Sequence, residues 1–257
     1  MKKHIKILAL VVLAIFTISC SLTDLVNKAK PTEEEPTERP TRTPRATKTP
    51  EPIFTEAPTE EPIDEPMMDL FLFDDFSSSD NYDWPLGYYP GNYADATYEI
   101  ANGVYSWEVN SHDSANERVW LSFDPFTDFD VSVDARQTTD NYSDCDYGLM
   151  FRQTDGSRLL SFTISNDEYD VYSYSEDEGW VEIVPYTYSE YIYPDGFNNL
   201  RVTAVDGYYT FYVNYVPVAD FYDYSIYEGD LGLNVDIIPA AALNCNFEFD
   251  NYMLMVP

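Results

Sequence analysis

Apolar and polar residues alternate along most of the chain beyond residue 69, and this period of two constrains the fold more than any other feature. Residues 129–134, for example, read Phe-Asp-Val-Ser-Val-Asp. Such alternation directs one set of side chains into a core and the other into solvent, as in a half-buried strand. The same pattern predicts strands at 104–109, 119–123, 147–153, 159–165, 169–174, 180–184, 200–205, 208–214, 216–221, 231–237 and 246–255. No segment carries a helical stripe, so the sequence predicts an all-β domain.

Short turn signals separate the predicted strands. Asn102-Gly103 and Asp206-Gly207 are pairs that favour tight hairpins, and Asp-Gly also occurs at 155–156 and 195–196. About a dozen short strands with such connections predict a sandwich or a barrel. We place this domain at residues 69–257, a length that one β-sandwich can occupy.

Seven short motifs resemble, in order, the landmarks of one known group of domains. They are FDDF (73–76), IANGVY (100–105), DFDVSV (128–133), YGLMFR (147–152), FYVN (211–214), GDLGL (229–233) and FEFDN (247–251). Together they resemble concanavalin A-like lectin/glucanase jelly rolls, including the LamG-like and 3-keto-disaccharide hydrolase-like modules of bacterial envelope proteins. The resemblance implies a jelly-roll sandwich of two antiparallel sheets, one of them concave. It also implies carbohydrate binding as the commonest function, although fold alone does not fix function.

The sequence does not reproduce the catalytic motif of that superfamily. Its glucanases resemble one another in a Glu-x-Asp-x-x-Glu strand, whose outer glutamates act as nucleophile and acid/base. The nearest acidic clusters here, 128–130 and 176–178, lack this spacing. Because glycoside hydrolysis requires two carboxylates at a defined separation, we predict no catalytic residues.

The N-terminus has the pattern of an export signal. Basic residues in 1–6 precede an apolar run at 7–16, which is too short to span a bilayer core. Ile18-Ser19-Cys20 resembles the lipobox of bacterial lipoproteins, with Thr17 where that family usually has Leu. We therefore predict a signal peptide at 1–19 and lipid attachment at Cys20, which would anchor the exported chain at the outer face of a membrane. The alternatives are an uncleaved anchor, or an ordinary signal peptide with Cys20 as an incidental thiol.

Residues 20–68 are expected to form a disordered linker. This segment is rich in Pro, Thr and Glu and poor in large apolar side chains. Repeated prolines block both helices and sheet ladders, and so few apolar groups do not offset the entropy of ordering the chain. The segment therefore predicts an extended, semi-stiff spacer between the anchor and the domain.

The charge of the domain limits its partners. Residues 69–257 contain 35 carboxylates, five arginines and no lysine, a formal charge of about −30. This excludes nucleic acid and direct binding of anionic lipid headgroups, which both require a basic surface. Carboxylates also suit Ca²⁺, so a structural calcium ion is an option. Two acidic groups are candidates for it, Asp140 with Asp144 and Asp146, and Asp74 with Asp75 and Asp250.

Two cysteines remain after export, Cys145 and Cys245. In an oxidising compartment such a pair is expected to form a disulfide. The only histidines are His4, inside the signal peptide, and His112, which disfavours both zinc and a Cys/His nucleophile.

Alternation also predicts an aromatic patch on one sheet face. If the strands at 147–153, 159–165 and 169–174 are neighbours, Arg152, Tyr172 and Tyr174 point away from the core, with Trp180 close by. Guanidinium and aromatic groups together suit sugar hydroxyls and sugar rings. The structural alternative is that Arg152 pairs with a nearby Asp while the tyrosines cover the sheet.

The sequence thus predicts a surface lipoprotein whose domain binds a glycan without catalysis. One alternative is a glycoside hydrolase or lyase with an unrecognised carboxylate pair. Another is a protein-interaction or structural module of the cell envelope that meets its partner through a tyrosine-rich face, since all 23 tyrosines lie at or beyond Tyr82.

Overall fold

The computed structural model describes residues 67–257, except 81, 140–143, 155–157 and 239–242. The predicted signal peptide, Cys20, nearly all of the linker, Asp140 and the turn at 155–156 lie outside the described residues. Within them the secondary structure consists of fifteen strands, where about a dozen were predicted, and it contains no helix, as expected for an all-β domain. In this part of the chain there is accordingly no helix of the length and apolarity needed to cross a membrane.

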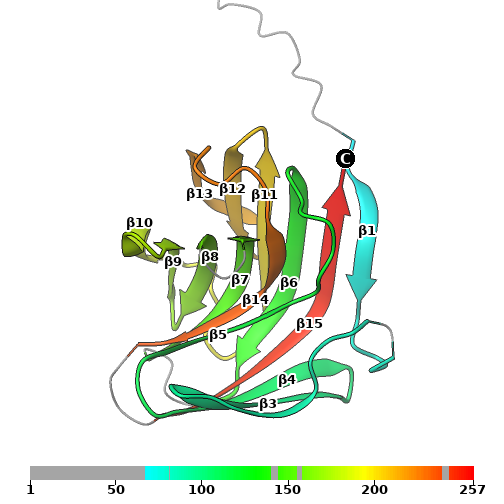
Figure 1. Ribbon diagram of the computed structural model, residues 1–257, viewed down its shortest axis with the longest axis vertical. Helices are drawn as coiled ribbons and strands as arrows, with labels where there is room; N and C mark the ends of the chain where they lie inside the picture. The colour runs from blue at the N-terminus through cyan, green and yellow to red at the C-terminus, as the bar shows by residue number, and fades with distance from the viewer. Residues whose placement is uncertain (1–66, 81, 140–143, 155–157, 239–242) are drawn as a thin grey trace, which may run out of the picture. The chain divides into compact units, whose positions relative to one another are not determined.

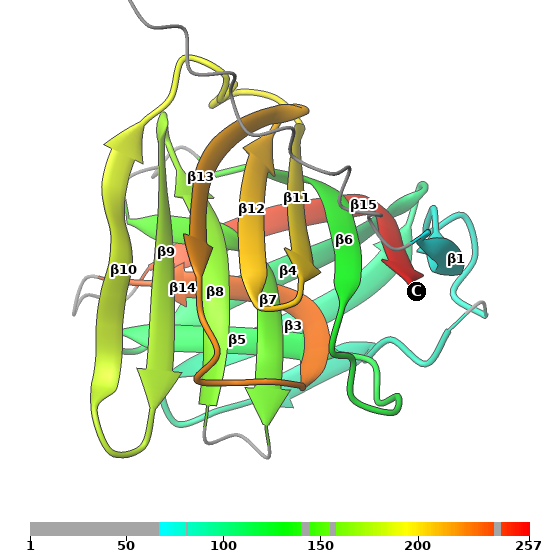
Figure 2. The ribbon, with the colours of Figure 1, turned by 90° about the horizontal axis from the view of Figure 1, so that it is seen from above.

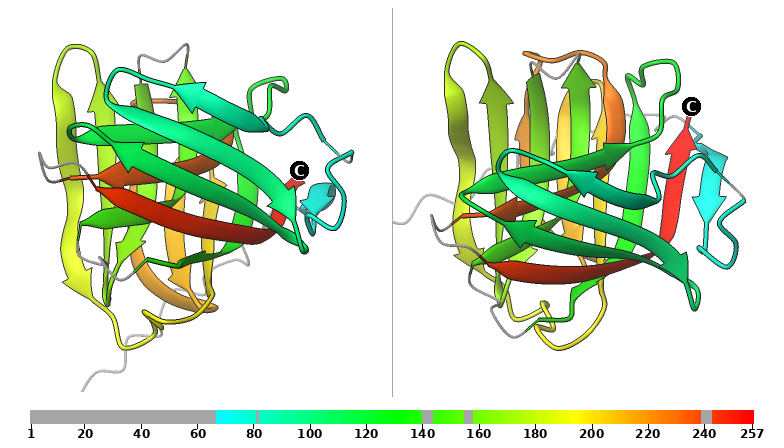
Figure 3. Two further views of the ribbon diagram at one scale, coloured as in Figure 1. Left: turned by 90° about the horizontal axis from the view of Figure 1, so that it is seen from below. Right: turned by 60° about the horizontal axis from the view of Figure 1, so that its bottom comes forward.

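Nine of the strands form one antiparallel sheet, in the order β13-β12-β11-β6-β15-β4-β3-β2, with β1 pairing β15 as well (Figure 1). Their bounds are β1 Asp69–Asp74, β2 Gly87–Pro90, β3 Ala94–Ala101, β4 Val104–Ser111, β6 Phe129–Gln137, β11 Asn198–Val205, β12 Tyr208–Val213, β13 Val216–Tyr222 and β15 Asn244–Val256. Figure 3 shows the long strand β15, in red, lying beside β4.

The other six strands form a second antiparallel sheet, in the order β10-β9-β8-β7-β14-β5. Their bounds are β5 Ala115–Trp120, β7 Cys145–Thr154, β8 Arg158–Ser165, β9 Glu168–Ser175, β10 Gly179–Tyr188 and β14 Asp230–Ile237. Figure 2 shows β7, β8, β9 and β10 running side by side.

The core lies between the two sheets. Phe151 of β7 packs against Tyr209 and Phe211 of β12, and Phe162 of β8 also contacts Phe211. The apolar residues predicted to point inward in β6, among them Phe129, are fully buried. Alternation therefore located the core correctly, and large aromatic side chains fill much of it.

Two predicted hairpins have the expected turn geometry. Asn102 and Gly103 have φ values of 56° and 78°, and Asp206 and Gly207 have 53° and 75°. Positive φ at both central residues defines the turn whose twist matches that of paired strands. These turns connect β3 to β4 and β11 to β12.

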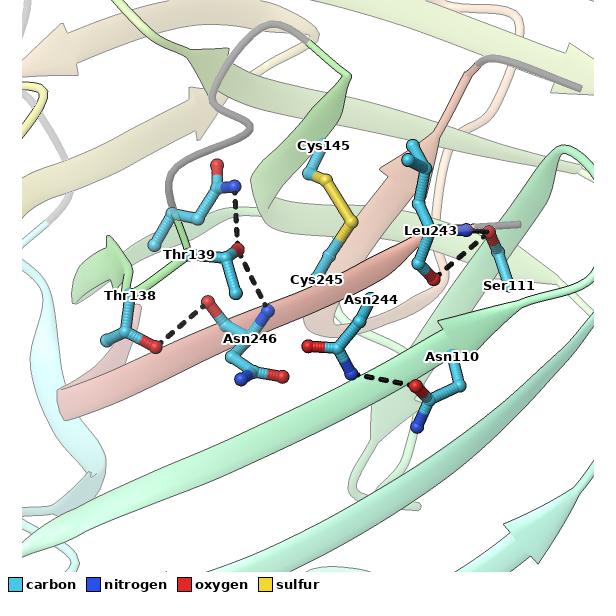
Figure 4. The surroundings of a disulfide bond; sticks show 10 residues. Asn110, Ser111, Thr138, Thr139, Cys145, Leu243, Asn244, Cys245 and Asn246 are labelled. Carbon is cyan, nitrogen blue, oxygen red and sulfur yellow. Dashed lines mark hydrogen bonds between the residues drawn. A yellow bond between two sulfur atoms is a disulfide. The ribbon is translucent and has the colours of Figure 1, made fainter. Parts of the chain in front are cut away.

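The predicted disulfide is formed, and it joins the two sheets. Cys145 begins β7 of the six-stranded sheet, and Cys245 lies in β15 of the nine-stranded sheet, with a Cα–Cα distance of 6.3 Å. Both residues are fully buried. Figure 4 shows the bond between the strands and the hydrogen bond from Asn244 Nδ2 to Asn110 Oδ1 (2.7 Å) nearby. The bond therefore fixes β7 against the opposite layer at its first residue.

Candidate functional site

Polar side chains gather on the outer face of the six-stranded sheet, the face directed away from the core. Asn116, Asp236 and Asp146 are register partners across β5, β14 and β7. Two residues further along these strands, Asn234 lies opposite Gly148. Residues two apart in a strand share a face, so these strands bring their polar side chains together.

The same arrangement continues across β8 and β9. Gly148 lies opposite Thr163, which in turn lies opposite Asp170 of β9. A Cβ atom on Gly148 would stand 2.1 Å from the carbonyl oxygen of Phe162, so only glycine fits there. Gly148 therefore adds no side chain to this face of the sheet, and the polar side chains of β14, β8 and β9 lie around it.

A cavity of about 350 Å³ opens on this face. We call it the carboxylate pocket. It is lined by Ser114, Ala115, Asn116, Asp146, Asp170, Tyr172, Trp180, Tyr186, Asp236, Ile237 and Ile238. Its volume falls in the range of small-molecule sites, which combine an apolar wall with a few convergent polar groups.

Two carboxylates in the pocket are almost completely buried, since Asp146 and Asp170 are each only 2% exposed. The hydroxyl of Tyr186 donates to Asp146 Oδ2, and the hydroxyl of Thr163 donates to Asp170 Oδ1. The other oxygen of Asp146, Oδ1, has no hydrogen-bond partner among the described residues. A buried carboxylate oxygen without a donor is costly, so it is available to a ligand that brings one.

Burial sets the protonation of these two groups. The pKa of Asp146 is raised to about 7, mainly because burial removes solvent and also because Asp236 and Asp144 are negatively charged, while the hydrogen bonds from Tyr186 and Ser165 act in the opposite direction. Burial likewise raises the pKa of Asp170 to about 8, with the charge of Asp146 adding to the effect. Both carboxyls are therefore poised to change charge near neutral pH.

Asp236 is held differently from the other two carboxylates. The side-chain amides of Asn116 and Asn234 both donate to it, the latter at 2.9 Å. Burial raises its pKa, while these two amides and the positive charge of Arg118 lower it. Three acidic groups thus share one pocket, but only Asp236 is clamped between two amides.

Aromatic side chains from β9 and β10 form one wall of the pocket. Trp180 is 46% exposed and packs against Tyr174, with ring centroids 5.0 Å apart. Tyr172 contacts Tyr186, and its hydroxyl donates to Glu182. Tyr172 and Trp180 line the pocket directly. The structure therefore brings together three of the four residues predicted for the patch.

The fourth residue, Arg152, is elsewhere, and its predicted outward orientation was wrong. It is 2% exposed and lies between the sheets, where its guanidinium donates to Tyr209 Oη and to the carbonyl of Phe126, both at 2.7 Å. The ladder shifts register after Phe151, and Arg152 has a φ of 59°. This bulge reverses the alternation. The arginine on the outer face is Arg118 of β5, which donates to Gln153 Oε1.

Of the two acidic groups considered for calcium, the structure describes the contacts of Asp74 and Asp146. Both oxygens of Asp74 accept hydrogen bonds, from the Phe76 amide and from Trp84 Nε1, each at 2.9 Å. Asp140 lies outside the described residues, and Asp146 is engaged by Tyr186. Within the described ranges no three acidic, Cys or His residues are grouped to hold a metal ion.

Sequence reasoning missed Asp170, Asp236 and Tyr186, and considered Asp146 only as a calcium ligand. The sequence does contain a signal for such residues, because some acidic residues lie within strongly apolar strand segments. Asp236, in the segment 231–238, is an example. Such positions are buried, and a buried carboxylate is a candidate functional group.

Known structures share this architecture. The laminarinase catalytic domain from Thermotoga maritima MSB8 aligns with 74% of this chain and 98% of its own length, at 9% identity and a TM-score of 0.54. The kappa-carrageenase from Pseudoalteromonas carrageenovora aligns with 77% of this chain and 99% of its own, at 13% identity and a TM-score of 0.53. The domain is a jelly-roll sandwich.

This likeness concerns the fold alone, because sequence identity is low. The carbohydrate-binding module CBM66 from Bacillus subtilis, at 18% identity, aligns with 66% of this chain and 95% of its own length, with a TM-score of 0.49. No protein-family model matches this sequence. No curated protein matches it either.

Proposed function

We propose that the domain binds carbohydrate in the carboxylate pocket and that it does so without chemical change. The observation that carries this proposal is the pairing of an aromatic wall, Tyr172 and Trp180, with a floor of buried hydrogen-bonding groups. A sugar ring offers an apolar face to an aromatic side chain and hydroxyls to polar groups, so it matches both parts of the pocket.

The fold gives independent support. Jelly-roll neighbours of this domain include proteins named as a laminarinase and a kappa-carrageenase, and the latter was solved in complex with an oligosaccharide of kappa-carrageenan. The Glu-x-Asp-x-x-Glu pattern is absent from this sequence. We therefore place binding ahead of catalysis.

The setting of the domain is part of the proposal. The chain is exported, lipidated at Cys20 and anchored at the outer face of a membrane, and residues 20–68 hold the domain away from that membrane. The disulfide between Cys145 and Cys245 supports export, because disulfides persist in oxidising compartments.

Replacing Trp180 with alanine should weaken polysaccharide binding about tenfold, because stacking of a Trp on a sugar ring contributes about 1–2 kcal/mol. The measurement is affinity electrophoresis and titration of the full chain against a panel of polysaccharides. Tyr215→Ala is the matched control, since Tyr215 is 76% exposed in the nine-stranded sheet's β12–β13 turn. Equal losses in both variants, or no binding by the folded wild type, would overturn the proposal.

Glycoside hydrolysis is the second candidate, and one observation favours it. Asp146 and Asp236 lie directly opposite each other on β7 and β14. Cβ atoms of such pairs are about 5 Å apart, which is compatible with the carboxyl separation of retaining glycosidases. In this reading Asp146, protonated near neutral pH, is the acid, and Asp236, held by two amides, is the nucleophile.

Release of reducing ends from the bound polysaccharide decides between the two candidates. A hydrolase should release them at a rate that both Asp146→Asn and Asp236→Asn lower about a thousandfold or more. If the wild-type chain binds the polysaccharide without releasing reducing ends, and Trp180→Ala lowers the affinity, the result supports binding and contradicts hydrolysis.

A further inference from the structure

Two buried carboxylates of the pocket, Asp146 and Asp170, have no cationic partner among the described residues. All five arginines of residues 69–257 are described and each is engaged elsewhere. Arg136 pairs with Glu248, Arg201 with Asp130, Arg118 with Gln153, Arg152 with Tyr209 and Arg158 with the carbonyl of Ser225. The segment contains no lysine, and His112 lies against Asp95.

The pocket is therefore short of positive charge and of donors. Asp146 and Asp170 are each 98% withdrawn from solvent. Asp146 receives hydroxyl hydrogen bonds from Tyr186 and Ser165, and Asp170 receives one from Thr163, but Asp146 Oδ1 has no donor among the described residues. Ionised carboxylates in such surroundings are unfavourable unless a cation or several donors join them.

The charged groups around the two carboxylates have the same sign, with one exception. Asp146 faces Asp236 of β14 and Asp144, and Asp170 faces Asp146, Asp236 and Glu182 of β10. The remaining titratable neighbours are the tyrosines Tyr172 and Tyr186. Arg118 of β5 is the exception, and its charge acts on Asp236.

Building on the proposed carbohydrate function, we propose that the pocket is specific for amino sugars that carry a free ammonium group. The ammonium would lie against Asp146 and Asp170, and the sugar ring would stack on Tyr172 or Trp180. An ammonium would stabilise the ionised form of these carboxyls and supplies three hydrogen-bond donors, including one for Asp146 Oδ1.

The alternatives within carbohydrate chemistry fit less well. A neutral sugar brings hydroxyl donors but no charge that would stabilise the ionised carboxylates, and an N-acetylated sugar has lost its charge. A uronate or a sulfated sugar is repelled by a domain of about −30 formal charge. That same charge attracts a polycationic glycan from a distance, so association should weaken as salt is added.

The test compares glucosamine oligomers with N-acetylglucosamine oligomers of the same length, titrated calorimetrically into the full chain with EDTA present at about pH 7, near the raised pKa of Asp146. We expect the free-amine oligomer to bind at least about tenfold more tightly. Asp146→Asn and Asp170→Asn should each remove that preference. Trp180→Ala should weaken both ligands. Glu99→Gln also replaces a carboxylate by an amide, but at an exposed position of β3, and should leave the preference intact.

The outcomes separate this inference from the function on which it rests. Equal or tighter binding of the N-acetylated oligomer overturns the ammonium preference but leaves carbohydrate binding in place. A loss of preference in Glu99→Gln as large as in Asp146→Asn also overturns it, because long-range charge alone would then account for the effect. If a folded chain binds none of the oligomers and polysaccharides, both the carbohydrate-binding function and the ammonium preference are overturned.

Discussion

The free energy of unfolding should fall as the pH rises from about 5 to about 8, and Asp170→Asn should remove a large part of that fall. In the folded chain, burial raises the pKa of Asp170 to about 8 from an ordinary value of 3.8. Between these values the unfolded chain has released a proton that the folded chain keeps. The unfolded state therefore binds fewer protons, and stability decreases with pH across this interval.

The expected size follows from about 1.4 kcal/mol for each pKa unit. Asp146 and Asp170 raise each other's pKa, so we expect Asp170→Asn to gain about 3 kcal/mol over the wild type at about pH 8 and almost nothing at about pH 4. Urea denaturation at a series of pH values measures this. Glu99→Gln should change the pH profile little. Parallel profiles for the wild type and Asp170→Asn would show that Asp170 is ionised in the folded domain.

Removing the disulfide should lower the free energy of unfolding by about 4–5 kcal/mol in the chain-entropy model. The bond between Cys145 and Cys245 closes a loop with a sequence separation of 100 and connects the two sheets. The Cys145→Ser/Cys245→Ser double variant, compared with the wild type in urea under oxidising conditions, gives the difference. Both side chains are fully buried, so some of the loss will reflect the altered packing of the serines.

Reduction provides the control for that comparison. A reducing agent should lower the urea midpoint of the wild type and leave that of the double variant unchanged. If the wild-type midpoint is insensitive to reduction under conditions that free both thiols, the bond does not contribute to stability.

Alternation predicted most of the strands that have one apolar face. The predicted segments 159–165 and 200–205 correspond to β8 Arg158–Ser165 and β11 Asn198–Val205. The prediction missed the first three strands, β1, β2 and β3. The four residues of β2 are all exposed and leave no alternating pattern, whereas β3 alternates and was overlooked. The prediction was also displaced at β5, which spans Ala115–Trp120 rather than 119–123, because Asn116 and Arg118 face the polar side of the sheet.

The candidate site could be predicted only in part, for a physical reason. Tyr172, Tyr174 and Trp180 follow from strand periodicity, and the structure places them together. Arg152 does not follow, because one bulged residue reverses the facing of a strand and the sequence carries no mark of it. The convergence of Asp146, Asp170 and Asp236 depends on the order β9-β8-β7-β14, which no local pattern encodes.

The floor and the wall of the pocket differ in how firmly their strands are held, because part of the wall stands on the edge strand β10. Asp146 and Asp236 stand on interior strands that are paired on both sides, and the disulfide holds β7 at the residue before Asp146. Trp180 and Tyr186 stand on β10, a sheet edge that pairs only with β9 through a ladder interrupted at Glu182 and again at Val184. Edge strands with broken ladders open at low free-energy cost. The floor is thus held in place, while the part of the wall that stands on β10 can shift to accommodate ligands of different width.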